Sequence, residues 1–231
     1  MCLALFTISD LHLSLSADKP MDIFKGWENY VQRLESNWRN VVGQNDTVVL
    51  PGDISWAMKL EDTKADFTFL HNLPGKKIIL KGNHDYWWST ISKMREFVNA
   101  QGWYTIDFVH NSAVKVGNVA VCGTRGWFYE HKGTDKIILR EAMRLEASIK
   151  AAKAVGGEPV VFLHYPPVSN KSRVDAIMNV LIENNIKRCY YGHIHTYRKS
   201  AHMAFSGEKD GIIFTPVSCD IINFTPVKIA Q

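Results

Sequence analysis

The chain has 231 residues, of which 46% are hydrophobic and 22% charged, and these fractions exclude a disordered or fibrous protein. The formal net charge of +4 is a mild basic excess that gives only weak support to an anionic substrate. It is far below the charge of a typical nucleic-acid-binding surface, so nucleic acid is not a favoured partner. A chain of this length is expected to fold as a single domain spanning residues 1–231.

Cysteine usage and the N-terminus indicate where the protein resides. Four cysteines, at positions 2, 122, 189 and 219, are widely separated and form no CxxC pair, so neither a disulfide framework nor a structural zinc site is expected. The apolar run 2–8 is short and has no basic segment before it, which favours a core strand over a signal peptide. No stretch reaches the roughly 18 apolar residues of a membrane span. We therefore expect a cytoplasmic protein.

In the first 85 residues, strand patterns alternate with helix patterns. Runs of apolar and β-branched residues predict strands at 3–8, 47–50 and 78–80. Apolar residues at helical spacing predict an amphipathic helix over 27–41, and a shorter helix is expected over 62–73. This alternation is typical of a largely parallel sheet.

The pattern changes after a predicted helix over 90–100. The segments that follow are predicted to be short strands: 104–109, 113–116 and 118–122. The longest predicted helix spans 135–155, because apolar residues recur there at helical spacing and Gly156 and Gly157 can end it.

A second strand-helix-strand unit is predicted in the remaining chain. Strands 160–163 and 189–191 are joined by a helix containing Ile177 and Leu181, and Ser172 to Asp175 resembles a capping box at its start. Three strand-like segments complete the tail: 199–205, 211–214 and 220–224. Two sheets with helices outside each are the most economical arrangement.

Side chains that can bind metals or transfer protons follow five of the predicted strands. They are Asp10 and His12; Asp53; Asn83, His84 and Asp85; His164; and His193 and His195. Ligands of an open α/β sheet bind beyond the carboxyl ends of its strands, so these side chains are expected to share one site. Gly82, at the end of the third strand, is expected to supply a positive φ angle for the turn.

The number of candidate ligands indicates two metal ions. Excluding His84 and Asp85, the set holds three oxygen ligands and four imidazoles, which is more than one ion uses. A carboxylate shared by two ions would explain the number, and such ion pairs clamp both oxygens of a phosphoryl displacement. A mixed nitrogen and oxygen set without thiolate suits divalent or trivalent Mn, Fe, Zn or Co better than Ca or Mg.

In this order, the motifs resemble those of the calcineurin-like metallophosphoesterase superfamily. The matching blocks are Asp10-x-His12, Gly52-Asp53, Gly82-Asn83-His84-Asp85, His164 and Gly192-His193-x-His195. The resemblance implies an α/β fold in which two mixed β-sheets pack as a sandwich flanked by helices, in four layers. It also implies a ligand assignment, in which one metal is held by Asp10, His12 and His195, the other by Asn83, His164 and His193, and both by a bridging Asp53.

The resemblance further implies a metal-dependent phosphoesterase that cleaves a phosphorylated small molecule by means of a metal-bound hydroxide. His84 would act as an acid or charge stabiliser, with Asp85 orienting it. Phosphodiesters are slightly favoured over phosphomonoesters as substrates. The protein Ser/Thr phosphatase branch is disfavoured because Ile54 to Met58 stand where that branch carries Asp-Arg-Gly. Two alternatives stay open, a nuclease and a non-catalytic metal-binding scaffold, although a scaffold would not need His84 and Asp85.

Candidate substrate contacts lie on or near the motif loops: Trp56, Trp87, Arg125, Trp127 and Tyr165. The aromatic rings could stack on a base or hold an apolar leaving group, and the arginine could reach a phosphate. The alternative is that the rings pack the loops onto the scaffold and that the arginine is solvated. Histidines outside the motifs, such as His71 and His110, are expected to be structural or exposed. The sequence does not indicate the oligomeric state.

Overall fold

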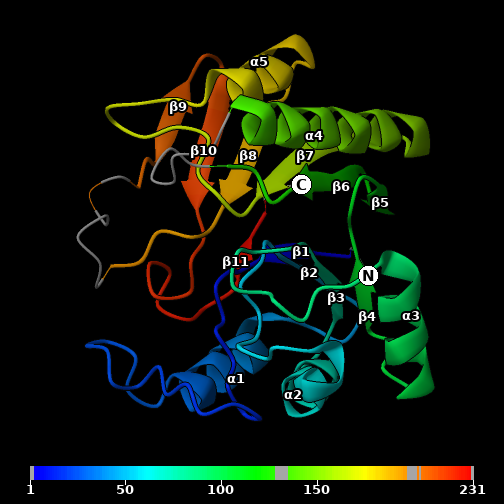
Figure 1. Ribbon diagram of the computed structural model, residues 1–231, viewed down its shortest axis with the longest axis vertical. Coiled ribbons are helices and arrows are strands. Elements are labelled where there is room, and N and C mark those ends of the chain that lie inside the picture. Colours follow the sequence, from blue (N-terminus) through cyan, green and yellow to red (C-terminus); the bar gives the residue numbers. More distant parts are fainter. Residues whose placement is uncertain (1–2, 128–134, 197–201, 203, 230–231) are drawn as a thin grey trace.

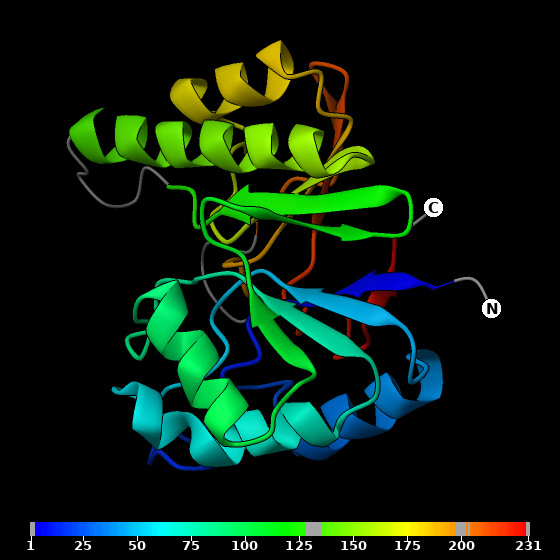
Figure 2. The ribbon, with the colours of Figure 1, turned by 90° about the vertical axis from the view of Figure 1, so that its right-hand side faces the viewer.

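The computed structural model describes residues 3–127, 135–196, 202 and 204–229 (Figure 1). Two mixed sheets of five and six strands face each other, and helices lie on the outer side of each. Figure 2 shows the four layers edge-on. The predicted sandwich of two sheets flanked by helices is confirmed.

The N-terminal sheet contains five strands. Their spatial order is β11 (Val227–Lys228), β1 (Leu5–Thr7), β2 (Thr47–Leu50), β3 (Lys76–Ile79) and β4 (Ile106–Phe108). Strands β1 to β4 are parallel, and β11 pairs antiparallel with β1. The carboxyl ends of β1, β2 and β3 therefore lie side by side at one edge of this sheet.

The second sheet contains six strands. Their order is β5 (Ala113–Val116), β6 (Val119–Thr124), β7 (Glu158–Leu163), β8 (Arg188–Tyr191), β10 (Ile212–Pro216) and β9 (Gly207–Lys209). The four central strands are parallel, and β5 and β9 pair antiparallel at the two edges. The carboxyl ends of β7 and β8 are thereby placed next to each other.

The helices cover the outer faces of the two sheets (Figures 1 and 2). Those on the N-terminal sheet are α1 (Tyr30–Val41), the 3-10 helix η1 (Leu60–Thr63), α2 (Lys64–Asn72) and α3 (Ile91–Ala100). Those on the second sheet are α4 (Asp135–Val155) and α5 (Asp175–Glu183). No helix among the described residues is both long and apolar enough to span a membrane.

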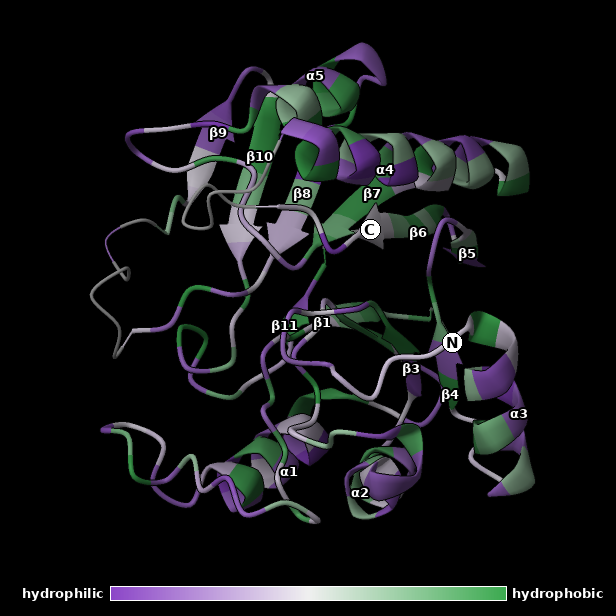
Figure 3. Cartoon of the chain, viewed as in Figure 1, coloured by the Kyte–Doolittle hydropathy of each residue, from purple (hydrophilic) through white to green (hydrophobic). Residues whose placement is uncertain are grey.

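Apolar side chains fill three layers, one between each sheet and its helices and one between the sheets. The middle layer includes Val49 of β2, Val121 of β6 and Phe162 of β7. Both faces of the central strands are therefore covered, and all residues of β2 and β6 are buried. This explains why these strands are continuous apolar runs (Figure 3).

Several local predictions were wrong. Segment 220–224 forms turns rather than a strand, and the short strands β9 and β11 were not predicted. The capping box does not form, because α5 begins at Asp175, after Val174, and no side chain caps it. In the predicted strand 199–205, residues 199–201 and 203 lie outside the described residues, and the rest is not strand.

Candidate metal centre

All the residues predicted to bind metal lie in loops that follow β1, β2, β3, β7 and β8. Backbone hydrogen bonds hold these loops together: the N–H of Asp10 donates to the carbonyl of Gly52, and the N–H of Gly192 donates to that of His164. Each of these two contacts joins loops of the same sheet. A hydrogen bond from the N–H of His193 to the carboxylate of Asp10 joins loops of different sheets. The candidate site is thus built from both halves of the sandwich.

Asp10, His12 and His195 form the first cluster, and their ligand atoms lie within 4.8 Å of one another. Nε2 of His195 lies 3.2 Å from Nε2 of His12 and 3.6 Å from Oδ1 of Asp10. All three side chains are buried. Burial raises the pKa of Asp10 to about 6, and the charge of His195 opposes that rise. An uncompensated carboxylate is thus unfavourable here.

Asn83, His164 and His193 form the second cluster. Oδ1 of Asn83 lies 2.6 Å from Nε2 of His164 and 3.0 Å from Nδ1 of His193. Nδ1 of His164 donates to the carbonyl of Pro51 at 3.1 Å, which leaves the lone pair on Nε2 facing the cluster. Burial and then the charge of His193 lower the pKa of His164 well below its usual value, so its ring is neutral.

Asp53 lies between the two clusters. Its Oδ2 is 3.5 Å from Nε2 of His164 in the second cluster and 3.8 Å from Nε2 of His12 in the first. Its Oδ1 accepts a hydrogen bond from the backbone of His84. The carboxylate therefore reaches ligand atoms of both clusters, which is the position that a bridging ligand requires.

The ligand loops contain an unusual concentration of left-handed backbone. The φ angles of Asp10, His12, Asp53 and His193 are 59°, 46°, 55° and 71°. Residues other than glycine rarely adopt such angles, and those that do cluster at functional sites, where the surrounding structure holds them. The sharp turns direct these side chains into the space between the strand ends.

Two motif glycines allow the loops to approach one another closely. A Cβ atom on Gly82 would overlap Oδ1 of Asp53, and one on Gly192 would overlap Oδ2 of Asp10. The expectation that Gly82 supplies a positive φ angle was wrong; Gly52, with a φ of 94°, has that role in the neighbouring loop. Glycine is required at position 82 because the Asp53 carboxylate occupies the place of a Cβ atom.

Asp220 is a residue of the site that was not predicted from the sequence. Its Oδ1 accepts a hydrogen bond from Nδ1 of His195 at 2.9 Å, and its Oδ2 accepts one from the backbone N–H of Thr196. Although burial opposes it, the hydrogen bond and charge of His195 lower the pKa of Asp220. The carboxylate therefore keeps the His195 proton on Nδ1 and leaves the lone pair of Nε2 directed at the first cluster. The sequence signal that could have identified Asp220 is its position as an acidic residue soon after strand β10.

Asp85 joins two ligand loops. Its buried carboxylate accepts hydrogen bonds from the backbone N–H groups of Gly82, Asp53 and Ile54 at 2.7, 2.9 and 2.8 Å, and from the indole of Trp87 at 3.0 Å. The role expected for Asp85 from the family resemblance was to orient the His84 ring. These hydrogen bonds support another role, that of holding the Asp53 and His84 loops in register.

His84 and Trp56 lie beside the first cluster. The ring of Trp56 stacks on that of His12 with centroids 4.9 Å apart, and the His84 ring lies 4.5 Å from Trp56 and 5.6 Å from His12. Trp56 is partly exposed, and its buried Nε1 has no hydrogen-bond partner in the described part of the chain. Both side chains are placed to meet a ligand at this cluster.

Two of the predicted substrate contacts are buried. Trp87 is 2% exposed, packs edge-on against Phe67 in the core and donates its indole N–H to Asp85, which supports a packing role rather than the predicted contact with substrate. Large aromatic side chains usually contribute buried area, which is its role here. Tyr165 is also 2% exposed, and its ring lies 4.4 Å from that of His193. It packs on a candidate ligand.

Trp127 and Arg125 lie on the side of the second cluster. Both side chains are partly exposed, and the guanidinium of Arg125 lies 5.2 Å from the centre of the Trp127 ring. The Trp127 ring in turn lies 5.7 Å from that of Tyr165. These two predicted contacts remain available to a substrate.

The chemistry of the donor atoms fits bound metal ions. In each cluster, atoms that can bind a metal through a lone pair face one another: Nε2 of His195 lies 3.2 Å from Nε2 of His12, and Nε2 of His164 lies 2.6 Å from Oδ1 of Asn83. Such contacts are repulsive unless a proton or a metal ion lies between the atoms. Buried carboxylates and neutral imidazoles are the forms that bind metals, so the described residues fit a site for two ions.

Solved structures resemble this one over nearly the whole chain. A protein of unknown function from Aquifex aeolicus has 17% identity and a TM-score of 0.53, covering 98% of this chain and 95% of that one. A protein of Thermus thermophilus has 13% identity and a TM-score of 0.55, covering 99% of each chain. Phosphopantetheinyl hydrolase (PptH) of Mycobacterium tuberculosis has 12% identity and a TM-score of 0.50, covering 99% and 96%. At these identities the likeness establishes the fold alone.

No curated protein matches the chain. The model of the family described as calcineurin-like phosphoesterase, however, matches residues 5–197, which contain every candidate metal ligand. The chain therefore belongs to the calcineurin-like phosphoesterase family and is a metal-dependent phosphoesterase.

Proposed function

We propose that the protein hydrolyses a phosphodiester bond in a small phosphorylated molecule, with two ions of Mn, Fe, Co or Zn. The observation that carries this proposal is the position of Asp53, whose Oδ2 lies 3.5 Å from His164 and 3.8 Å from His12. Two ions sharing that carboxylate would activate water and neutralise charge on the phosphoryl oxygens. The other donors are imidazole, carboxylate and amide groups, which suit these metals.

His84 supplies the remaining catalytic group. Its backbone N–H donates a hydrogen bond to Asp53, and its ring lies beside His12 and Trp56. The ring is therefore next to the first cluster but is not one of its three proposed ligands. From this position the imidazole would donate a proton to the leaving oxygen or stabilise charge on the phosphoryl group. A scaffold that only bound metals would have no use for it.

The aromatic side chains support a diester as the substrate. Trp56 stacks on His12 in the first cluster, while Trp127 lies against Tyr165, which packs on His193 in the second. Apolar contact area is therefore present at both ends of the paired clusters. A phosphodiester has two organic substituents, and each would meet one of these rings.

The test is hydrolysis of bis(p-nitrophenyl) phosphate and p-nitrophenyl phosphate by protein loaded separately with each of the four metals. We expect hydrolysis that a chelator abolishes and that metal restores, with a higher kcat/KM for the diester. Higher kcat/KM for the monoester would overturn the substrate preference. No hydrolysis of either ester by protein shown to hold two ions would overturn the proposal as a whole.

A further inference from the structure

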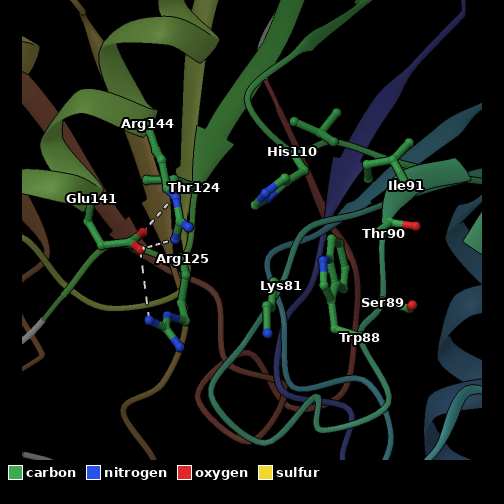
Figure 4. Close-up of a pocket in the computed structure, with 11 residues that line it drawn as sticks. Lys81, Trp88, Ser89, Thr90, Ile91, His110, Thr124, Arg125, Glu141 and Arg144 are labelled. Carbon is green, nitrogen blue, oxygen red and sulfur yellow. Dashed lines mark hydrogen bonds and ion pairs between the residues drawn. The ribbon is translucent and has the colours of Figure 1, made fainter. Parts of the chain in front are cut away.

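A cavity of about 450 Å³ lies next to the ligand loops, outside the metal centre (Figure 4). One wall carries Arg125, after β6, and Arg144, from α4. The opposite wall carries Lys81, after β3, together with Trp88 and His110. The cavity therefore lies between the two halves of the sandwich and has the size of a small-molecule site.

Positive charge predominates in the cavity. Glu141 is the one carboxylate among the described residues that line it, whereas Lys81, Arg125 and Arg144 are cationic. The Glu141 carboxylate is completely buried and accepts hydrogen bonds from Arg144 at 2.6 Å and from Thr124 at 2.8 Å. Among the lining residues, one acid thus faces three cations, which is an excess of about two positive charges.

Arg125 is available to a ligand. Its Nη2 is 3.8 Å from Oε1 of Glu141, which is beyond hydrogen-bonding distance, and its buried Nε has no hydrogen-bond partner in the described part of the chain. A buried donor without an acceptor is unfavourable, and an oxyanion in the cavity would supply one. Burial and then the charge of Arg144 lower the pKa of His110, which agrees with a positive field.

The cavity and the metal centre share their supporting loops. The carbonyl of Arg125 accepts hydrogen bonds from the backbone N–H groups of His164 and Tyr165 at 3.1 and 2.9 Å. Lys81 lies two residues before Asn83, and the N–H of Trp88 donates to the carbonyl of Asp85. A molecule bound at the metals through one phosphoryl group could therefore extend into the cavity.

We propose that this cavity binds a second phosphoryl group of the substrate, which would then be a compound with two phosphoryl groups joined by a short organic linker. A phosphate dianion matches this excess of about two positive charges, and guanidinium groups bind phosphate through several hydrogen bonds. The location of the cavity is independent of the proposed function, but its assignment to the substrate rests on it.

The test uses a series of α,ω-alkanediol bisphosphates, from ethanediol to hexanediol, each paired with the alkyl monophosphate of the same length. Their binding to metal-loaded protein is measured by calorimetry and, separately, by inhibition of nitrophenyl ester hydrolysis. Two linked groups that reach two sites gain from effective concentration only when the linker spans them. We expect one linker length at which the bisphosphate binds at least about tenfold more tightly than its monophosphate.

Two variants examine the opposite walls, Arg125→Gln and Lys81→Met. Each is expected to reduce the ratio between bisphosphate and monophosphate affinities to within about threefold, because each removes a cation from the cavity. Arg39→Gln is the matched control, since Arg39 is exposed on α1 and pairs with Glu35. Its ratio should equal that of the unaltered protein. Metal content and circular dichroism are recorded for every variant.

The possible results separate the two proposals. Equal affinities for bisphosphate and monophosphate at every length would overturn the cavity site, and so would an advantage that is the same at all lengths and disappears with added salt, because that is general electrostatic steering. Hydrolysis without a preferred length would leave the proposed function intact. A preferred length that Arg125→Gln removes, in a protein that hydrolyses no ester, would support the cavity site and reject the function.

Discussion

The backbone N–H of His84 donates a hydrogen bond of 2.7 Å to Oδ1 of Asp53. The other oxygen of the same carboxylate lies between the two metal-ligand clusters. The main chain of His84, the proposed acid, is therefore hydrogen-bonded to Asp53, the proposed bridging ligand. This hydrogen bond fixes the position of the His84 backbone, and hence of its ring, relative to the two clusters. A change in the His84 side chain should leave this hydrogen bond intact, so catalysis and metal binding can be separated by mutation.

His84→Ala is expected to keep both metals and to lower kcat by about 10²- to 10⁴-fold on a diester with a poor alkoxide leaving group. The loss should be much smaller on a nitrophenyl ester, because that leaving group needs little protonation. Steady-state kinetics on both esters, with elemental analysis, provides the measurement. Equal losses would assign His84 to stabilising the phosphoryl oxygens, and loss of a metal would refute the ligand assignment.

Asp53→Asn is expected to weaken both metal sites, since one carboxylate oxygen faces both clusters. The measurement is metal content after dialysis against a graded series of chelator concentrations. Asp107→Asn serves as the control because Asp107 is an exposed partner of Arg95. If Asp53→Asn weakened only one of the two sites, Asp53 would not be the bridge.

Asp220→Asn is expected to weaken only the site formed by Asp10, His12 and His195, by about 10- to 100-fold in affinity. Without its negative charge, residue 220 accepts the Nδ1–H hydrogen bond of His195 more weakly, which leaves the ring less basic at Nε2. Competition with a chromogenic chelator would resolve the two sites. An equal loss at both sites would mean that the variant acts through the fold.

Trp87→Ala should chiefly lower stability, whereas Trp56→Ala should chiefly weaken substrate binding. Trp87 is 2% exposed and packed on Phe67, so its removal should reduce the free energy of unfolding by about 3 to 5 kcal/mol. Trp56 is partly exposed beside His12, so its removal should chiefly raise KM, by up to about tenfold. Urea denaturation and kinetics on one diester would decide. A raised KM for Trp87→Ala with unchanged stability would restore it as a substrate contact.

Lys77 is expected to make stability depend on pH. Its side chain is completely buried and donates to the carbonyls of Leu73 and Gly75, and burial lowers its pKa from 10.5 to about 7. Between these values the unfolded chain holds a proton that the folded chain has released, so stability should rise with pH from about 7 towards 10.

The measurement for Lys77 is urea denaturation of the metal-free protein at several pH values in that range. In Lys77→Met, which has a similar volume and no charge, the rise should be smaller than in the unaltered protein. Lys76→Met, at the exposed neighbouring position, should retain the full rise. Curves of the same slope for all three proteins would show that Lys77 does not titrate in this range.

The main strands and helices, the two-sheet sandwich and the set of candidate metal ligands could all be predicted from the amino-acid sequence. These are local properties: each ligand, from Asp10 to His195, lies within a few residues of the end of an apolar run, and such runs are readable without a partner. The helix over 135–155 was equally readable, because α4 shows its apolar face at regular spacing along its whole length.

The contacts of each of these residues, in contrast, became known only from the folded chain. Asp220 contacts His195, which is 25 residues away in the sequence, and Asp85 binds the Asp53 loop, which is more than 30 residues away. Arg125 lines one cavity together with residues of α4 and of the segment around His84. The same holds for Trp87 and Trp56, which have similar chemistry and proximity to a motif, yet one is buried and the other faces the site. Burial and hydrogen-bond partners depend on chain segments far apart in sequence, and a pattern read along one segment contains no information about the other.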